Sequence, residues 1–170
     1  GSIVVNDGDP CLLCTSVPWQ NFELVVEYKA DSDTNSGVFL RTPLNPENPA
    51  EDCYEVNIAP TDNPVPTGGI VKRKKATEFK AASDEWHTMK MVMDGKRLQV
   101  AVDGNNVCDY TDKIGVAEGR IGLQHNSGRI EFRNIRLRPL GLNSLLDEQL
   151  TQWTKYPEMP GEFSVTDEGY

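Results

Sequence analysis

The chain lacks the long apolar segments and the basic surface that would place it in a membrane or on nucleic acid. No stretch approaches the roughly 18 apolar residues that a membrane-spanning helix needs. The formal net charge is −9 over 170 residues, which argues against nucleic acid as a partner because phosphate binding requires a basic surface. The one strong basic cluster runs from Lys72 to Lys75. A solvated hairpin face and a local anion- or sugar-facing site are both open interpretations of it.

The cysteine and glycine patterns exclude further classes of function. No glycine-rich phosphate loop is present, so no nucleotide cofactor is indicated. There are four cysteines, of which Cys11 and Cys14 form a Cys-X-X-Cys pair between turn residues and a strand-like run. Positions three apart in an extended chain point to opposite faces of a sheet, which argues against redox or zinc chemistry. We therefore expect buried free thiols rather than a disulfide framework.

No metal site is predicted with a full set of ligands. Asp31, Asp33 and Asn35 have a loop spacing that calcium could use, but no bidentate glutamate follows at a suitable distance along the chain. An ordinary polar turn is the simpler interpretation of these three residues. We expect no cofactor.

What the chain does contain is a series of short strand patterns separated by turn residues. Hairpin signals at Asp94-Gly95 and Asp103-Gly104 join some of these runs. Helix signals are poor until a short capped turn expected at residues 143–149. The regular spacing predicts an all-β fold, an antiparallel two-sheet sandwich or jelly roll. The predicted strands are 22–29, 36–41, 53–58, 69–72, 86–93, 97–102, 106–110, 120–124 and 129–138.

The last of these runs alternates strictly in character. Ile130 and Phe132 fall on one face together with Asn134. The pattern places Glu131, Arg133 and Leu137 on the opposite face, and we expect Glu131 and Arg133 to be exposed.

Seven short motifs follow one another along the chain. They are Asn21-Phe22-Glu23-Leu24, Asn35-Ser36-Gly37-Val38-Phe39-Leu40-Arg41, Tyr54-Glu55-Val56-Asn57-Ile58, Pro66-Thr67-Gly68-Gly69-Ile70, Glu85-Trp86-His87-Thr88, Gly122-Leu123-Gln124-His125 and Glu131-Phe132-Arg133-Asn134-Ile135-Arg136. No single motif is decisive, but the ordered set, over about residues 3–140, resembles the 3-keto-disaccharide hydrolase domain family. The resemblance implies that family's jelly-roll fold, which is similar to concanavalin-like lectins and glucanases.

The chain departs from the family's pattern at its two ends. Residues 1–141 lack the opening strand that members usually carry, while residues 142–170 resemble such an opening, with Trp153 and Val165-Thr166-Asp167-Glu168-Gly169. We expect the later segment to complete the sandwich in its own copy, in a tandem copy or by strand exchange with a neighbouring chain, because an unpaired sheet edge would otherwise remain. We predict that Phe163 and Val165 insert beside residues 3–5.

The resemblance implies carbohydrate as the partner and cleavage of 3-keto-glycosides as the activity. A ketone at carbon 3 acidifies the proton on carbon 2, so a base can remove that proton and the glycosidic oxygen at carbon 1 then leaves. A non-catalytic carbohydrate-binding module is the alternative, because folds of this shape serve both purposes. The chain opens with Gly-Ser, which resembles a cloning remnant. A signal peptide can therefore have been removed, and we expect a secreted or periplasmic location.

Strand alternation places Arg41, Glu55, Asn57 and Gln124 on one concave sheet face and so selects candidate residues for this chemistry. Glu55 or His125 is the candidate base, and Arg41 or a lysine of the 72–75 run is the candidate stabiliser of the enolate. Asn57, Gln124, Lys72 and Lys74 are the candidate substrate-binding residues. Structural roles remain open beside these: Arg41 can pair with Glu55 across strands, Gln124 can satisfy backbone groups, and His125 can cap a turn.

Overall fold

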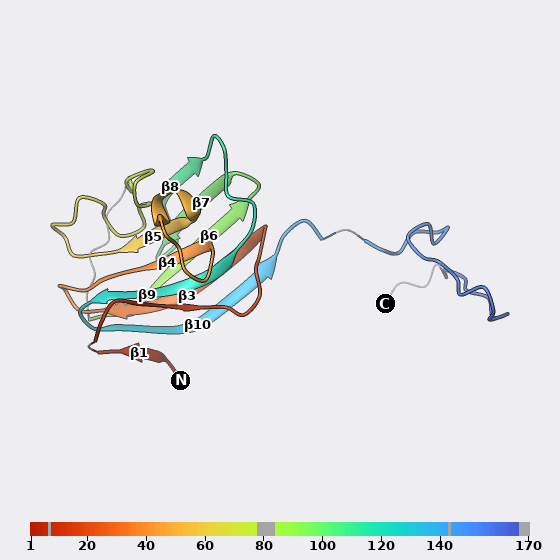
Figure 1. Cartoon of the computed structure of the whole chain (residues 1–170), viewed down its shortest axis with the longest axis horizontal. Helices are drawn as coiled ribbons and strands as arrows, with labels where there is room; N and C mark the ends of the chain where they lie inside the picture. The colour runs from red at the N-terminus through yellow and green to blue at the C-terminus, as the bar shows by residue number, and fades with distance from the viewer. Residues whose placement is uncertain (7, 78–83, 143, 167–170) are drawn as a thin grey trace. The chain divides into compact units, whose positions relative to one another are not determined.

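The computed structural model describes residues 1–6, 8–77, 84–142 and 144–166, and it divides into two compact units. The first unit comprises Gly1–Leu140 and the second Gly141–Tyr170. Nearly all the regular structure lies in the first unit (Figure 1). No helix among the described residues is long and apolar enough to cross a membrane.

The first unit is a sandwich of two antiparallel sheets, which confirms the predicted fold class. One sheet has six strands in the order β1-β10-β3-β6-β7-β8, and the other has four in the order β2-β9-β4-β5. A four-residue helix, α1 (Pro49–Asp52), precedes β5. The strands are β1 (Ile3–Val5), β2 (Cys11–Cys14), β3 (Phe22–Ala30), β4 (Asn35–Thr42), β5 (Tyr54–Ile58), β6 (His87–Asp94), β7 (Arg97–Val102), β8 (Asn105–Thr111), β9 (Arg120–Ser127) and β10 (Ile130–Pro139).

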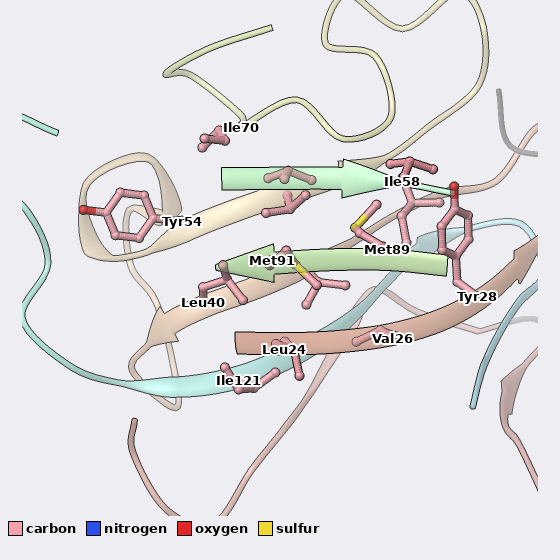
Figure 2. Close-up of a cluster of buried hydrophobic side chains, with 14 of the residues drawn as sticks. Leu24, Val26, Tyr28, Leu40, Tyr54, Ile58, Ile70, Met89, Met91 and Ile121 are labelled. Carbon is pink, nitrogen blue, oxygen red and sulfur yellow. The ribbon is translucent and has the colours of Figure 1, made fainter. Parts of the chain in front are cut away.

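The core lies between the two sheets and is built from alternate residues of their strands. In β3 every second side chain, from Phe22 to Ala30, is buried. Leu40, Tyr54 and Ile58 of the four-stranded sheet meet Leu24, Met89 and Met91 of the six-stranded sheet (Figure 2). The burial of these apolar side chains is the main stabilising contribution to the sandwich, and it fixes which residues of each strand must point away from the core.

The strict alternation predicted for the last strand is wrong beyond residue 133. The register of β10 against β3 shifts between Arg133 and Arg136, and Asn134 has a φ of 49°. Because this bulge inserts one extra residue in β10, the residues after it point to the other side of the sheet than strict alternation predicts. Leu137 therefore packs against the core, on the same side as Phe132. The expected exposure of Glu131 is also wrong, because it is buried and bonded to Lys29, Arg129 and Ser2.

The expected run at 69–72 is a pair of single bridges rather than a strand. Ile70 bridges to Val56 of β5 and to Lys74, and residues 71–74 form a turn. The cysteine prediction is correct in part. All four thiols are free, and Cys53 and Cys108 are buried, but Cys11 is exposed and Cys14 is half-buried.

The second unit, taken by itself, contains no helix or strand among its described residues. Where a short capped turn is expected at residues 143–149, the described residues form turns in which the Asp147 carboxylate accepts hydrogen bonds from Thr151. Trp153 and Phe163 are 59% and 78% exposed. The run expected to pair with residues 3–5 lies partly outside the described residues, and its strand role stays a prediction.

Candidate functional site

The candidate site is the outer face of the four-stranded sheet, which we define as the face that points away from the core. The pairing register aligns Leu12, Gln124, Gly37 and Asn57 in one row across the sheet, and Cys14, Gly122, Phe39 and Glu55 in the next row of the same orientation. The residues between these rows, among them Val38, Val56 and Leu123, belong to the core. Alternation therefore turns both rows outward.

Phe39 is 3% exposed, yet it lies outside the core cluster and forms part of the floor of the outer face. Its row also contains Gly122, where an added Cβ would lie 2.9 Å from Leu12 Cδ1 and 3.1 Å from Phe39 Cβ. The floor is therefore apolar and closely packed at this point, and no residue larger than glycine fits at position 122 without displacing its neighbours.

Glu55 is the candidate base, and it lies half-buried on this face. A Cβ at Gly37 would stand 3.2 Å from Glu55 Cγ and 3.3 Å from Oε1, so the carboxyl group lies over a position that has no side chain. Burial raises the pKa of Glu55 to about 7, although a hydrogen bond from Gln124 opposes the rise. A carboxyl group of this kind is partly ionised at neutral pH and can both accept and return a proton.

Gln124 and Asn57 share the outer face with Glu55 but have different surroundings. Gln124 bonds Glu55, and its buried Oε1 has no hydrogen-bond partner. The Asn57 amide donates to the carbonyl of Val65 at 2.5 Å, and Asn57 is buried. Gln124 thus keeps an unsatisfied acceptor beside Glu55, whereas Asn57 holds the proline-rich loop against the sheet.

His125 lies on the opposite face of β9 from Gln124, and the structure does not bring it together with Glu55. It is 3% exposed. Its Nε2 is 2.9 Å from the carbonyl oxygen of Gly128, and this nitrogen carries the proton because a carbonyl can only accept a hydrogen bond. Its Nδ1 is buried without a partner. The contact matches the turn-capping alternative stated for His125.

Arg41 also lies away from Glu55. The strand register places Phe39, not Arg41, opposite Glu55, and a register shift in β4 precedes Thr42. The Arg41 guanidinium donates to the carbonyls of Gln20, Gly95 and Val116 and to the side chain of Asn21. Its φ of 54° shows the local distortion that accompanies this arrangement. Arg41 therefore joins loops at one end of the sandwich.

The basic run is anchored to the sandwich by Arg73. This side chain bonds Asp112 at 2.6 Å and the Cys53 carbonyl at 3.0 Å. Lys74 Nζ donates to the carbonyl of Asp109 in β8, at the edge of the other sheet, so Lys74 does not join Glu55. Lys72 is exposed in the turn that follows the backbone hydrogen bond from Val71 to Glu55.

Arg120 is the residue of the outer face that we did not select from the sequence. It begins β9, two residues before Gly122 and four before Gln124, so all three point to the same side. Its Nε is buried without a hydrogen-bond partner. The alternation of Arg120-Ile-Gly-Leu-Gln124 contained this signal, because it aligns the arginine with the candidate Gln124.

No group of three or more His, Cys, Asp or Glu side chains that could hold a metal occurs in the part of the chain that the structure describes. At the loop considered for calcium, the Asp31 carbonyl accepts a hydrogen bond from the Thr34 amide. This contact is typical of a polar turn.

The family match and the solved structures given next indicate a carbohydrate-active, glycosyl hydrolase-like domain. The chain belongs to the family of 3-keto-alpha-glucoside-1,2-lyase-like domains, which it matches over residues 1–138. The resemblance drawn from the motifs is thereby confirmed. Comparison with curated proteins gave no match.

Solved structures share the fold at low sequence identity. A Parabacteroides distasonis protein provisionally assigned as a glycosyl hydrolase is 23% identical, with a TM-score of 0.70 over 82% of this chain and 87% of its own. A second such protein from that organism is 16% identical, with a TM-score of 0.71 over 82% and 81%. The carbohydrate-binding module CBM66 of Bacillus subtilis is 15% identical, with a TM-score of 0.57 over 79% and 84%.

Proposed function

We propose that the chain cleaves 3-keto-glycosides by elimination, with Glu55 as the base. The observation that carries the proposal is a single carboxyl group on the outward strand positions of the four-stranded sheet, with its pKa raised to about 7. Ordinary glycosidases use two carboxyl groups on either side of the scissile bond, whereas elimination beside a ketone needs one base near carbon 2.

In the proposed reaction, the Glu55 carboxylate takes the proton from carbon 2 and the electron pair of that bond forms an enolate with carbon 3. The ketone then re-forms, a double bond appears between carbons 1 and 2, and the bond from carbon 1 to the glycosidic oxygen breaks. The leaving oxygen takes up a proton, which the Glu55 carboxylic acid can return. Water adds to the double bond later. Gln124, beside Glu55, binds a sugar hydroxyl in this proposal.

The test is turnover of a 3-keto-glucoside by the wild-type chain and by Glu55→Gln, with release of the alcohol measured. We expect a loss of roughly 10²- to 10⁴-fold in kcat for the variant. For the wild type, kcat/KM should rise as pH increases through about 7, because the base must be ionised. Glu51→Gln changes an exposed carboxylate of the nearby helix α1 and serves as the control. Cleavage by Glu55→Gln at the wild-type rate would refute the assignment of Glu55 as the base.

The structural likeness to CBM66 supports a second candidate function, that of a carbohydrate-binding module. Absence of an exposed aromatic residue from the outward strand positions makes simple sugar stacking a weaker explanation, because Phe39 is the one aromatic there and is buried. Binding of the 3-keto-glucoside by the wild-type chain without any release of alcohol would favour the module.

A further inference from the structure

Arg120 is the guanidinium on the outer face that the fold leaves without a partner. Its Nε is buried and unbonded, and no carboxylate among the described residues lies within ion-pair distance of it. Arg136 is the one other arginine in the described ranges without a hydrogen bond or ion pair, and Arg136 is exposed to water. Arg120 therefore combines partial burial with an unused donor.

An unsatisfied donor of this kind has an energetic cost. A buried polar group without a hydrogen bond loses its hydration without compensation, and the cost is greater when the group is charged. Cys14, on the neighbouring strand, does not offset this cost as a thiolate. Arg120 lowers the pKa of the Cys14 thiol, but burial raises it by more and the net direction is upward. The thiol thus stays neutral, and it leaves Arg120 Nε without an anionic partner among the described residues.

The position of Arg120 relative to Glu55 suits one sugar unit. Their strands are separated by β4, and Arg120 lies two residues along β9 from Gly122, which is in the row of Glu55. Standard strand spacing and rise then separate the two Cα atoms by about 12 Å. Gly122 contributes no side chain to the floor between them. Two long side chains that reach inward over this distance can contact opposite sides of a hexose ring.

We propose that Arg120 binds the oxygen on carbon 3 of the keto sugar and stabilises the negative charge that this oxygen acquires when Glu55 removes the proton from carbon 2. The assignment rests on the proposed function above. A cation or donor is needed at this oxygen. Arg41 and Lys74, two of the cations considered for the role from the sequence, bond other groups of the fold. The guanidinium offers two parallel N–H groups to one oxygen or to two adjacent ones.

The kinetic test compares Arg120→Gln and Arg120→Lys with the wild type on a 3-keto-glucoside. Loss of one donor to a developing oxyanion lowers kcat by roughly 10²- to 10³-fold, so we expect Arg120→Gln to lose that much in kcat with a smaller change in KM. Arg120→Lys should recover part of the loss, because it keeps the charge but not the Nε–H. Arg136→Gln is the matched control and should match the wild type. An unchanged kcat for Arg120→Gln would overturn the assignment and leave the proposed function in place.

A spectroscopic test uses the intact arginine and does not depend on turnover. The ¹⁵N–¹H signal of Arg120 Nε can be assigned by its absence from the spectrum of Arg120→Lys. In the Glu55→Gln variant, we expect this signal to shift on addition of the 3-keto-glucoside and much less on addition of the parent glucoside, which has a hydroxyl group at carbon 3.

The kinetic and spectroscopic tests distinguish the proposed role of Arg120 from the proposed lyase activity. A shift without cleavage by the wild-type chain supports the Arg120 contact and refutes the lyase activity. Glucuronate, which has a carboxylate at carbon 6 and no ketone at carbon 3, is the third ligand. A signal that responds to glucuronate alone, or to none of the ligands, would overturn the assignment of Arg120.

Discussion

Glu55→Gln should raise the stability of the fold at alkaline pH and have little effect at acidic pH. The folded-state pKa of Glu55 is raised from 4.5 to about 7 because the carboxyl group is desolvated. Below 4.5 the group is protonated in both states and contributes nothing to the pH dependence. As pH rises toward 7, the unfolded chain ionises more readily than the folded one, so Glu55 destabilises the fold increasingly and its full cost is present above 7.

One pKa unit corresponds to about 1.4 kcal/mol. The difference between 4.5 and about 7 therefore corresponds to about 3 kcal/mol at pH 8. Glutamine is similar in size and carries no charge, so the stability gained by the variant over the wild type should grow by about 3 kcal/mol between pH 4 and pH 8. Comparing the two proteins at each pH removes the contributions of the other carboxylates.

Urea unfolding followed by circular dichroism measures this difference, since the midpoint and slope give the free energy of unfolding at each pH. Glu23→Gln is a control with the opposite sign. Lys90 lowers the pKa of Glu23, so that variant should lose stability above the ordinary glutamate pKa and match the wild type in acid. If Glu55→Gln changed the free energy of unfolding equally at pH 4 and pH 8, the raised pKa of Glu55 would be refuted, and with it the argument that Glu55 is a base.

Two further perturbations test the frame around the site. Arg41→Met should lower the free energy of unfolding by about 3 kcal/mol, because it leaves three carbonyls without their side-chain donor and removes one of the two donors to Asn21 Oδ1. Arg136→Met is the exposed control, and equal urea midpoints for Arg41→Met and the wild type would contradict this role. Truncation after Gly141 should leave the sandwich folded, because its core lies within residues 1–140. If the tail exchanges with a neighbouring chain, light scattering should find a concentration-dependent dimer for the full chain and a monomer for the truncated one, and identical masses would refute the exchange.

The sequence predicted the strands and the faces of the sheet better than the contacts of individual side chains. Alternation placed Glu55, Asn57 and Gln124 on one face correctly, because burial of every second residue leaves a strand only one register. It failed for β10, where the bulge near Asn134 changes the face without any clear signal in composition. It also gave no indication that Arg41 would bond three carbonyls, since those partners come from loops far away in the chain.

His125 and Arg120 show that residue type alone does not predict which side chains lie on the outer face. His125 drew attention by residue type, yet its place in β9 turns it inward with Ile121 and Leu123. Arg120 looked like an ordinary strand end, yet the same alternation turns it outward with Gln124. Chemistry-bearing residue types are therefore a weaker guide to a site on a sheet than the face on which the strand places them.

The outer face combines two features that do not stabilise the fold. Glu55 has an ionised form that burial opposes, and Arg120 has a buried donor that no described group satisfies. Buried atoms without a partner also occur at Arg73 Nε, Tyr28 Oη and His125 Nδ1, but Arg120 Nε and Gln124 Oε1 lie on the same sheet face as Glu55. Selection for stability alone removes uncompensated groups, while sites that bind or react retain them. The two groups lie across Gly122 on one sheet face, where a single ligand with an acidic C–H and a neighbouring oxygen would compensate both.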